Sequence, residues 1–367
     1  MKKKAVFPGQ YHQGQGILSE LPEITSIFGG NPLLLASSSV KTKILPVFGT
    51  DKITSSIPNE LFRGQCCEDE IERLTHIVTN KKIDVMIGMG GGKTIDTAKI
   101  VADRAGIPVI IVPTIASTDA PCSGCAVVYS NDDVFESVQY QKRNPTAVVV
   151  DMNIISHAPS RFLVSGMGDA LATWFEARSC ERTRSLNECG GLSLMTGLHL
   201  AKLCYDILLD QGLSAKIANE AHIVTPALES IAEANILLSG VGFESSGLAA
   251  AHAIHNGLTA LKETHTFFHG EKVAFGVLAG LHLTGAEPKE ISQVYSFCES
   301  IGLPTTLTEI GLEDVDTDSL FIAASKACEP GQSIHNEAGI ITPTMVMHSM
   351  IMADALGQAR KSPTCAL

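Results

Sequence analysis

The sequence predicts two domains: an α/β domain over residues 1–160 and an all-helical domain over residues 161–367. Up to Pro159, short apolar runs alternate with segments of helical spacing, which is typical of a parallel sheet covered by helices on both faces. After Arg161 almost every segment has helical spacing and strand signals disappear. A chain of 367 residues also exceeds what one hydrophobic core usually serves, so length alone favours two domains.

The α/β half is expected to place strands at its apolar runs and helices at its periodic segments. Residues 5–18 carry turn signals, and Ile17–Phe28 then has a helical period. Pro32–Ala36 is a short buried strand, and the alternation continues through Ile44–Phe48 and a helix over Glu68–Asn80. Further strand signals lie at Asp84–Met89, Pro108–Pro113, Val127–Tyr129 and Ala147–Asp151, with a helix over Thr94–Arg104.

The second half is expected to be entirely helical. Its apolar residues recur at three- and four-residue intervals, which line one face of a helix. The clearest examples are Ala170–Glu181, Leu192–Leu209, Ser214–Asn219, Pro226–Leu238 and Lys289–Ile301.

One glycine-rich stretch, residues 84–99, indicates strand, tight turn and helix in succession. Its four glycines at 88 and 90–92 lack Cβ atoms, so backbone N–H groups can approach an anion at the positive end of the following helix. A Walker A loop is excluded, because Ile87 stands where its first glycine belongs, and the dinucleotide fingerprint of three spaced glycines fits poorly. Two interpretations stay open: a phosphate site, or a turn whose glycines serve backbone geometry only.

The composition limits the classes of partner. A net charge of −12 argues against nucleic acid or an anionic membrane surface and favours small molecules. The basic start Met1–Lys4 is followed by Pro8 and polar residues rather than by the apolar core of a signal peptide, and no apolar run is long enough to span a membrane. A cytoplasmic protein is therefore expected.

A polar loop follows the apolar strand that ends at Pro113. It delivers hydroxyl and carboxyl groups at the carboxyl end of that strand, where α/β sheets bind ligands. The alternative is a capped turn, because these residue types are also ordinary turn formers. The residues concerned are Thr114, Ser117, Thr118, Asp119 and Ser123.

The helical half contains a carboxylate and several imidazoles in small-residue surroundings. His252 and His255 lie three apart on one helix face, His269 starts a later segment, and Asp169 follows Gly166-Met-Gly168. Such a set suits zinc or ferrous iron with a position left open for substrate. The alternatives are that Asp169 caps the start of a helix and that the histidines are ordinary core or surface groups.

These motifs together resemble the bacterial glycerol dehydrogenases, within the iron-containing (group III) alcohol dehydrogenase superfamily that also has dehydroquinate synthase as a relative. The resemblance is long and thins after about residue 285. It implies a Rossmann-like N-terminal domain and a helical C-terminal domain, as in dehydroquinate synthase, with the active site between them. It covers Pro8–Gly14, Gly88–Lys99, Pro113–Ser123, Gly166–Ala177, Val224–Glu229, Gly240–Thr259, His269–Gly276 and Ile334–Asn336.

The resemblance also implies site residues, a zinc ion and a nicotinamide cofactor, with a small polyol as substrate and a homo-oligomer, commonly an octamer. Zinc would be bound by Asp169, His252 and His269, with His255 close by. Asp119 would hold substrate hydroxyls, and Asp119 and His252 are the expected catalytic residues. The cofactor site would comprise Ser37, Gly90, Gly91, Gly92, Lys93, Thr114, Ser117, Ser123, Cys125 and Tyr129.

One departure from the family pattern bears on the cofactor. Where these enzymes usually place a Gly-Asp pair whose carboxylate binds the adenosine ribose, this chain has Ala36-Ser37, with Lys41 and Lys43 nearby. The missing carboxylate normally repels a 2′-phosphate, so NADP is expected to be tolerated; the alternative is that Ser37 still binds the ribose hydroxyls of NAD. Another small diol, hydroxyketone or amino alcohol as substrate would keep every motif. A glycerol 1-phosphate enzyme, a P-loop phosphotransferase and a non-enzymatic homologue are disfavoured.

Overall fold

The computed structural model describes residues 2–49, 53, 57–132 and 134–362, and these form two compact units. The sheet unit comprises Val6–Leu163 and Ile217–Gly240. The helical unit comprises Met1–Ala5, Val164–Lys216 and Val241–Leu367. The sequence predicts a single boundary at residue 160, with residues 217–240 in the helical domain. In the structure these residues instead group with the sheet unit.

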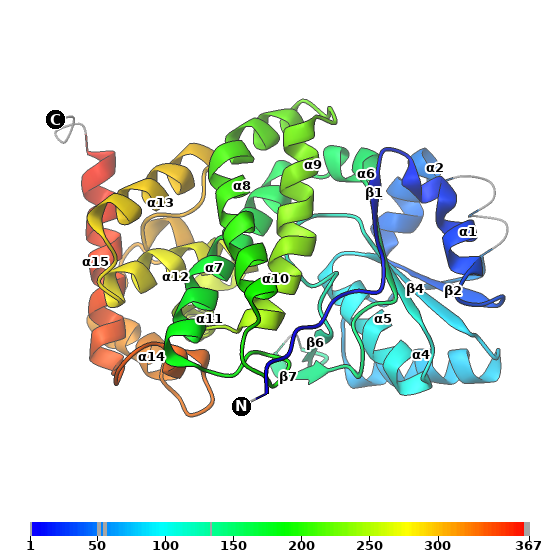
Figure 1. Cartoon of the computed structure of the whole chain (residues 1–367), viewed down its shortest axis with the longest axis horizontal. Coiled ribbons are helices and arrows are strands. Elements are labelled where there is room, and N and C mark those ends of the chain that lie inside the picture. Colours follow the sequence, from blue (N-terminus) through cyan, green and yellow to red (C-terminus); the bar gives the residue numbers. More distant parts are fainter. Residues whose placement is uncertain (1, 50–52, 54–56, 133, 363–367) are drawn as a thin grey trace. The chain divides into compact units, whose positions relative to one another are not determined.

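The sheet unit is built on a six-stranded sheet in which every neighbouring pair is parallel (Figure 1). The strand order is β1-β8-β5-β4-β2-β3. The strands are β1 (Tyr11–Gly14), β2 (Pro32–Ala36), β3 (Asn59–Leu61), β4 (Val85–Gly90), β5 (Val109–Pro113) and β8 (Ala147–Asp151). This confirms the predicted parallel sheet, although β1 lies within a segment from which only turns were expected.

Both faces of the sheet are covered, as its nearly continuous apolar strands require. Alternate residues, among them Leu34, Ile87 and Val149, form one core with Leu18 and Leu21. On the other face α5 packs against β4 and β5, and Gly88 lets it approach, because a Cβ there would lie 2.6 Å from the Ala98 Cβ. The helices are η1 (Ile17–Glu20), α1 (Leu21–Ser26), η2 (Val40–Ile44), α2 (Leu45–Phe48), α4 (Glu68–Asn80), α5 (Gly92–Ala105), α6 (Met152–His157), α9 (Pro226–Glu233) and η3 (Ala234–Leu238).

One local prediction for this unit was wrong, and a second was confirmed only in part. Ile44–Phe48 is helical rather than extended, because it falls at the end of η2 and in α2. The strand signal at Val127–Tyr129 is real, but β6 (Cys125–Tyr129) pairs antiparallel with β7 (Phe135–Tyr140) in a separate two-stranded sheet. The half-exposed alternation along β6 suits such a ribbon better than a doubly covered sheet.

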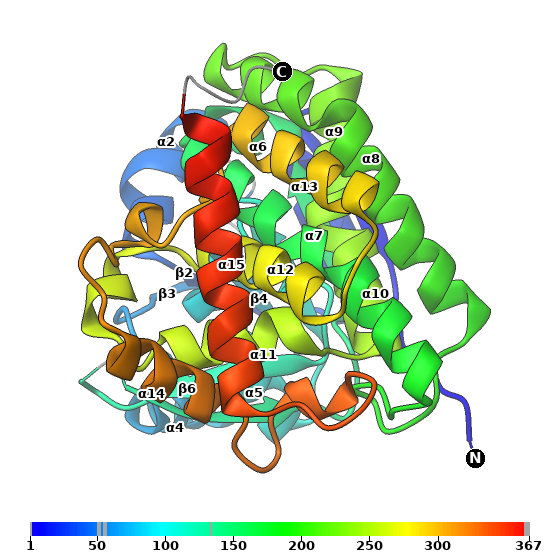
Figure 2. The same cartoon turned by 90° about the vertical axis from the view of Figure 1, so that its left-hand side faces the viewer.

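The helical unit has no strand among its described residues, as the sequence predicts. Helix α11 packs against α12 and α14, and α15 packs against α12 and α14 (Figure 2). Helices α7, α8 and α10 each cross from one unit into the other along the chain. The helices are α7 (Ser160–Thr183), α8 (Met195–Glu220), α10 (Ser239–Ser246), α11 (Ala250–Leu258), η4 (Lys262–Thr266), α12 (His269–Leu283), α13 (Pro288–Ile301), η5 (Thr308–Ile310), α14 (Thr317–Ala327), η6 (Ser333–Asn336) and α15 (Pro343–Lys361).

No helix in the described part of the chain combines the length and the apolar character that a membrane crossing needs.

Candidate metal and cofactor sites

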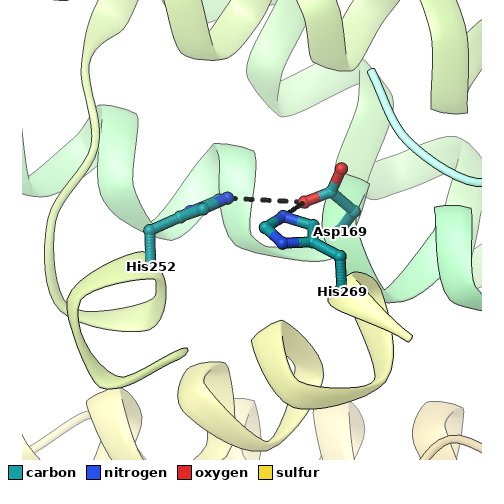
Figure 3. Close-up of side chains that lie close together, drawn as sticks. All are labelled: Asp169, His252 and His269. Atoms are coloured by element: carbon teal, nitrogen blue, oxygen red, sulfur yellow. Dashed lines mark hydrogen bonds and ion pairs between the residues drawn. The ribbon is translucent and has the colours of Figure 1, made fainter. Parts of the chain in front are cut away.

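Three side chains from three helices of the helical unit converge on one point (Figure 3). Asp169 comes from α7, His252 from α11 and His269 from the first residue of α12. One ligand atom from each lies within 4.8 Å of the other two. The Asp169 Oδ1 atom is 3.0 Å from the His269 Nε2 atom and 3.4 Å from the His252 Nε2 atom. The residues predicted to bind the metal are thus brought together.

Glycines beside two of these residues allow the helices to approach so closely. A Cβ on Gly270 would lie 1.7 Å from the Ser165 carbonyl oxygen, and one on Gly168 would lie 2.3 Å from the Gly270 carbonyl oxygen. Helix α12 therefore starts directly against the backbone of α7, which places His269 beside Asp169. The alternative that Asp169 caps a helix start is wrong, because α7 begins at Ser160 and Asp169 lies well inside it.

Burial and the neighbouring charges shift the pKa of Asp169, which is 1% exposed, in opposite directions. Burial by itself raises the pKa of this carboxyl, but the charge of His269 and hydrogen bonds from both imidazoles outweigh it and leave the pKa below its usual range. Burial likewise lowers the pKa of His252, yet Glu176 and Asp169 raise it well above 6.5. Asp169 is therefore held as a carboxylate.

The chemistry of this donor set fits a divalent transition metal. One carboxylate oxygen and two imidazole nitrogens are the ligands that zinc and ferrous iron take in catalytic sites, where three protein ligands leave a position open. The Nδ1 atom of His252 is engaged by Glu176 at 2.6 Å, so its Nε2 atom is the nitrogen turned toward Asp169. The predicted metal residues therefore suit zinc.

His255 lies near the cluster without belonging to it. Its Nε2 atom is 3.1 Å from the Nδ1 atom of His269, the ring nitrogen on the side away from Asp169. Burial, with the nearby charges of His269 and Lys272, lowers the pKa of His255 well below 6.5. A neutral His255 can therefore exchange a hydrogen bond with His269, as expected for a residue close to the metal site.

The predicted phosphate turn lies at the carboxyl edge of the parallel sheet. From β2 the chain leads outward to β3 on one side and later returns to β4 and β5 on the other, so the strand order reverses between β2 and β4. Ser37 follows β2 and Gly90 ends β4, and the Ser37 N–H donates to the Met89 carbonyl at 3.3 Å. Ligands of open α/β sheets bind at such a reversal.

The glycines of the turn differ in their surroundings. Gly91 is the N-cap of α5, and a Cβ there would meet the Ile115 side chain at 3.2 Å. A Cβ on Gly90 would lie 2.8 Å from the Thr94 hydroxyl, whereas one on Gly92 would meet nothing within 4 Å. The helix therefore opens onto free space at Gly92, where its N–H groups and positive dipole end favour an anion.

Two of the other predicted cofactor residues, Thr114 and Tyr129, lie beside this turn and the helix that follows it. Thr114 follows β5, and its N–H donates to the Gly90 carbonyl at 3.1 Å. The Lys93 Nζ atom lies 5.0 Å from the centre of the Tyr129 ring. The Cys125 thiol lies 3.4 Å from the Ser123 hydroxyl, and Ser117 is half-buried in the loop that begins at Thr114.

Asp119, the predicted substrate-binding residue, is also held within the sheet unit. The Ser239 hydroxyl donates to its Oδ2 atom at 2.9 Å. The Asn235 side chain, on the π-helix η3, donates to the carbonyls of Ala116 and Leu163 at 3.0 and 3.1 Å. Residues 217–240 therefore fix the loop that carries Asp119, and π-helical turns are often found beside functional sites.

Comparison with known proteins agrees with this geometry. The family model described as iron-containing alcohol dehydrogenase matches residues 8–152. A glycerol dehydrogenase of Thermotoga maritima is 51% identical over 98% of this chain and 99% of its own length. The chain belongs to the iron-containing alcohol dehydrogenase family. It is therefore an oxidoreductase.

Other members of the family extend the comparison. The glycolaldehyde reductase of Halobacterium salinarum is 41% identical over 96% of this chain and 97% of its own length. A crystal structure of a probable glycerol dehydrogenase from Sinorhizobium meliloti superposes with a TM-score of 0.91 at 43% identity, covering 97% of this chain and 99% of that one. The fold predicted from the sequence is that of these enzymes.

Four buried charged residues were not predicted from the sequence, although they contact the segments that carry the candidate metal and cofactor residues. Lys99 on α5 donates to the carbonyls of Ala120 and Cys125, and Asp96 accepts from the Val127 N–H at 3.1 Å. Glu176 and Glu337 accept backbone N–H groups at the start of α11. Glu176 had one usable signal: it stands seven residues after Asp169, two helical turns along the same face.

Proposed function

We propose that this enzyme oxidises the secondary hydroxyl of glycerol to dihydroxyacetone, reversibly, with hydride passing to a nicotinamide cofactor and with zinc held by Asp169, His252 and His269. The observation that carries the proposal is the convergence of those three side chains within 4.8 Å. The 51% identity to a protein named glycerol dehydrogenase, over nearly the whole of both chains, supports the substrate.

Two carboxylates of the chain would have different roles, Asp169 in holding the metal and Asp119 in positioning the substrate. Zinc, when bound, supplies Lewis-acid chemistry that lowers the pKa of an alcohol hydroxyl toward neutrality. Asp169 contributes the negative charge of its carboxylate, which stays ionised because His269 and His252 lower the pKa of the carboxyl group. Asp119, oriented by Ser239, would accept hydrogen bonds from the remaining hydroxyls and so favour a vicinal diol over a simple alcohol.

The cofactor proposal rests on the carboxyl edge of the sheet. The N–H groups at Gly91 and Gly92 would bind the pyrophosphate, with Lys93 adding positive charge. Ser37 would lie beside the adenosine ribose: its hydroxyl is 3.0 Å from that of Ser39 and accepts from the Val40 N–H at 3.3 Å. Because no carboxylate stands at this position, we propose that NAD is used and NADP is tolerated.

A second candidate is a reductase of a small hydroxyaldehyde or hydroxyketone built on the same site. The 41% identity to a protein named glycolaldehyde reductase favours it. Such a substrate shares with glycerol a hydroxyl next to the reacting carbon, which Asp119 would bind in the same way. A hydroxyaldehyde such as glycolaldehyde differs from dihydroxyacetone in bearing a hydrogen atom instead of a second hydroxymethyl group on the reacting carbon.

The test is initial-rate kinetics on metal-free and zinc-reconstituted enzyme, each with NAD and with NADP, followed by the absorbance of the reduced nicotinamide. We expect zinc-dependent oxidation of glycerol, and less than a hundredfold difference between the cofactors in kcat/KM. Folded, zinc-loaded enzyme that is inert toward glycerol but reduces glycolaldehyde would replace the first candidate by the second. A preference for NAD of a hundredfold or more would contradict NADP tolerance.

The homo-oligomeric state and the cytoplasmic location remain predictions. Sedimentation velocity on the purified chain would test the first, and fractionation of cells would test the second.

A further inference from the structure

Glu176 is a buried carboxylate that contacts a predicted metal ligand from outside the ligand set. It lies on α7, is 1% exposed, and divides its two oxygens between two tasks. The Oε2 atom is 2.6 Å from the Nδ1 atom of His252. The Oε1 atom accepts from the backbone N–H groups of Ala249 and His252, each at 2.9 Å.

The start of α11 explains the second task. The first N–H groups of a helix have no partner inside the helix and are usually satisfied by a capping side chain. The N-cap here is Ala249, which has no side chain that can accept a hydrogen bond. Two carboxylates from elsewhere replace it: Glu176 takes two of these N–H groups, and Glu337 accepts from the Ala250 N–H at 3.2 Å.

The first task decides which nitrogen of His252 carries a proton. A neutral imidazole has one N–H donor and one acceptor nitrogen, and a carboxylate can only accept. The contact with Glu176 therefore keeps a proton on Nδ1, so the nitrogen that would give up its proton and bind a metal is Nε2, which lies 3.4 Å from the Asp169 carboxylate. Carboxylates that hold a metal-binding histidine in this way commonly tune metal affinity.

We propose that Glu176 is a positioning residue that fixes the tautomer and ring orientation of His252 for metal binding while it caps α11. This inference rests on the proposed function, because it takes His252 as a metal ligand. Capping and orientation are coupled through a single rigid carboxylate: the backbone contacts of Oε1 hold the group in place, and Oε2 then points at the ring.

The substitution Glu176→Gln separates the two tasks. The amide oxygen can keep the two backbone hydrogen bonds of Oε1, but the NH₂ group then faces Nδ1 and donates to it. His252 must accept at Nδ1, so its proton moves to Nε2, the nitrogen that should bind the metal. The opposite orientation of the amide, with its oxygen toward Nδ1, would set the NH₂ group against two backbone N–H groups and lose both hydrogen bonds. That orientation is therefore disfavoured.

The matched control is Glu337→Gln. Glu337 caps the same helix end by accepting from the Ala250 N–H, whereas the Nδ1 atom of His252 is held by Glu176. Loss of charge at the start of α11 is common to both variants, whereas inversion of the His252 tautomer is confined to Glu176→Gln. A purely structural role for Glu176 would make the two variants behave alike.

The experiment measures zinc affinity of the full-length wild type and both variants by competition with a chromophoric chelator, together with the Tm of each metal-free protein. We expect Glu176→Gln to bind zinc about 10- to 100-fold more weakly, with a metal-free Tm like that of Glu337→Gln, and Glu337→Gln to bind zinc as the wild type does. The visible spectrum of the cobalt(II)-loaded proteins should change for Glu176→Gln only.

Three outcomes would overturn the inference. Unchanged zinc affinity in Glu176→Gln would show that the tautomer is not set by this residue. Equal weakening in both variants would trace the effect to the helix end. A wild type that binds no divalent metal would remove the proposed function itself, an outcome distinct from the other two.

Discussion

The two candidate sites are built in opposite ways. The metal cluster consists of side chains from residues far apart in the sequence, and glycines bring their helices into contact. The phosphate turn consists of backbone N–H groups from consecutive residues at the end of one strand. A site made of converging side chains depends on each of those side chains, whereas a site made of backbone N–H groups depends on open space in front of them. Substitutions in the two regions should therefore fail differently.

The largest effect is expected at Asp169. Asp169→Asn removes the only carboxylate of the cluster, so zinc affinity and kcat/KM at limiting zinc should each fall by more than about 100-fold, beyond the usual cost of losing a residue that merely orients a ligand. Zinc titration with steady-state kinetics measures both. Asp206→Asn, at an exposed carboxylate of α8 paired with Lys202, is the control. Equal behaviour of the two variants would remove Asp169 from the site.

Lys99 provides the corresponding test in the sheet unit. Its buried ammonium lies 3.1 Å from the Asp96 Oδ1 atom and 3.0 Å from the Ala120 carbonyl, so Lys99→Met would leave a buried carboxylate without this cation. We expect the free energy of unfolding, measured with urea, to fall by about 3 kcal/mol. Lys81→Met removes the exposed pair with Glu60 and should cost at most about 1 kcal/mol. Equal losses of unfolding free energy in the two variants would mean that the contacts of Lys99 with Asp96 and with the Ala120 carbonyl do not stabilise the fold.

The glycine turn should separate binding from stability. A Cβ on Gly92 enters open space in front of α5, so Gly92→Ala should weaken cofactor binding about tenfold while leaving the Tm unchanged or slightly higher, since alanine favours a helix. Gly88→Ala drives a Cβ into Ala98 and should cost about 1–3 kcal/mol of stability instead. Cofactor titration by fluorescence and thermal unfolding measure the two effects. A Gly92→Ala protein with normal cofactor affinity would contradict a phosphate site at this helix end.

The smallest effect is expected for the ion pair between Arg104 and Glu68 on the surface of the sheet unit. The hydrogen bond from Arg104 lowers the pKa of Glu68, so this pair stabilises the protein above the unfolded pKa of the carboxyl and loses its effect as pH falls through the lowered value. Both side chains are partly exposed, so Glu68→Gln should cost at most about 1 kcal/mol near pH 7, and this cost should shrink as the pH falls through the lowered pKa of Glu68. Urea unfolding of wild type and variant over a series of decreasing pH values measures this. A loss that does not change with pH would rule out the charge as its cause.

The sequence could predict what depends on neighbours along the chain. The apolar runs gave β2, β4, β5 and β8, and helix α4 follows from its own period between Glu68 and Asn80. The turn at 88–92 was visible because glycine is the residue that such backbone geometry demands.

Tertiary contacts decided the rest. Gly168 looked like part of a helix start, yet it serves the approach of α12 to α7, a contact with residues a hundred positions away. Strand β1 was hidden because its pairing with β8 is a long-range hydrogen-bond pattern. The position of Glu176 on the same helix face as Asp169 was visible in the sequence, but its bond to His252 was not, since only the folded helices bring the two residues together.

The most direct test of the central claim is diffraction from zinc-soaked crystals of the wild type at energies on either side of the zinc absorption edge. The account predicts one strong anomalous peak within bonding distance of the Asp169 carboxylate, the His252 Nε2 atom and the His269 Nε2 atom. A peak elsewhere, or none between these three residues in crystals that bind zinc, would contradict it.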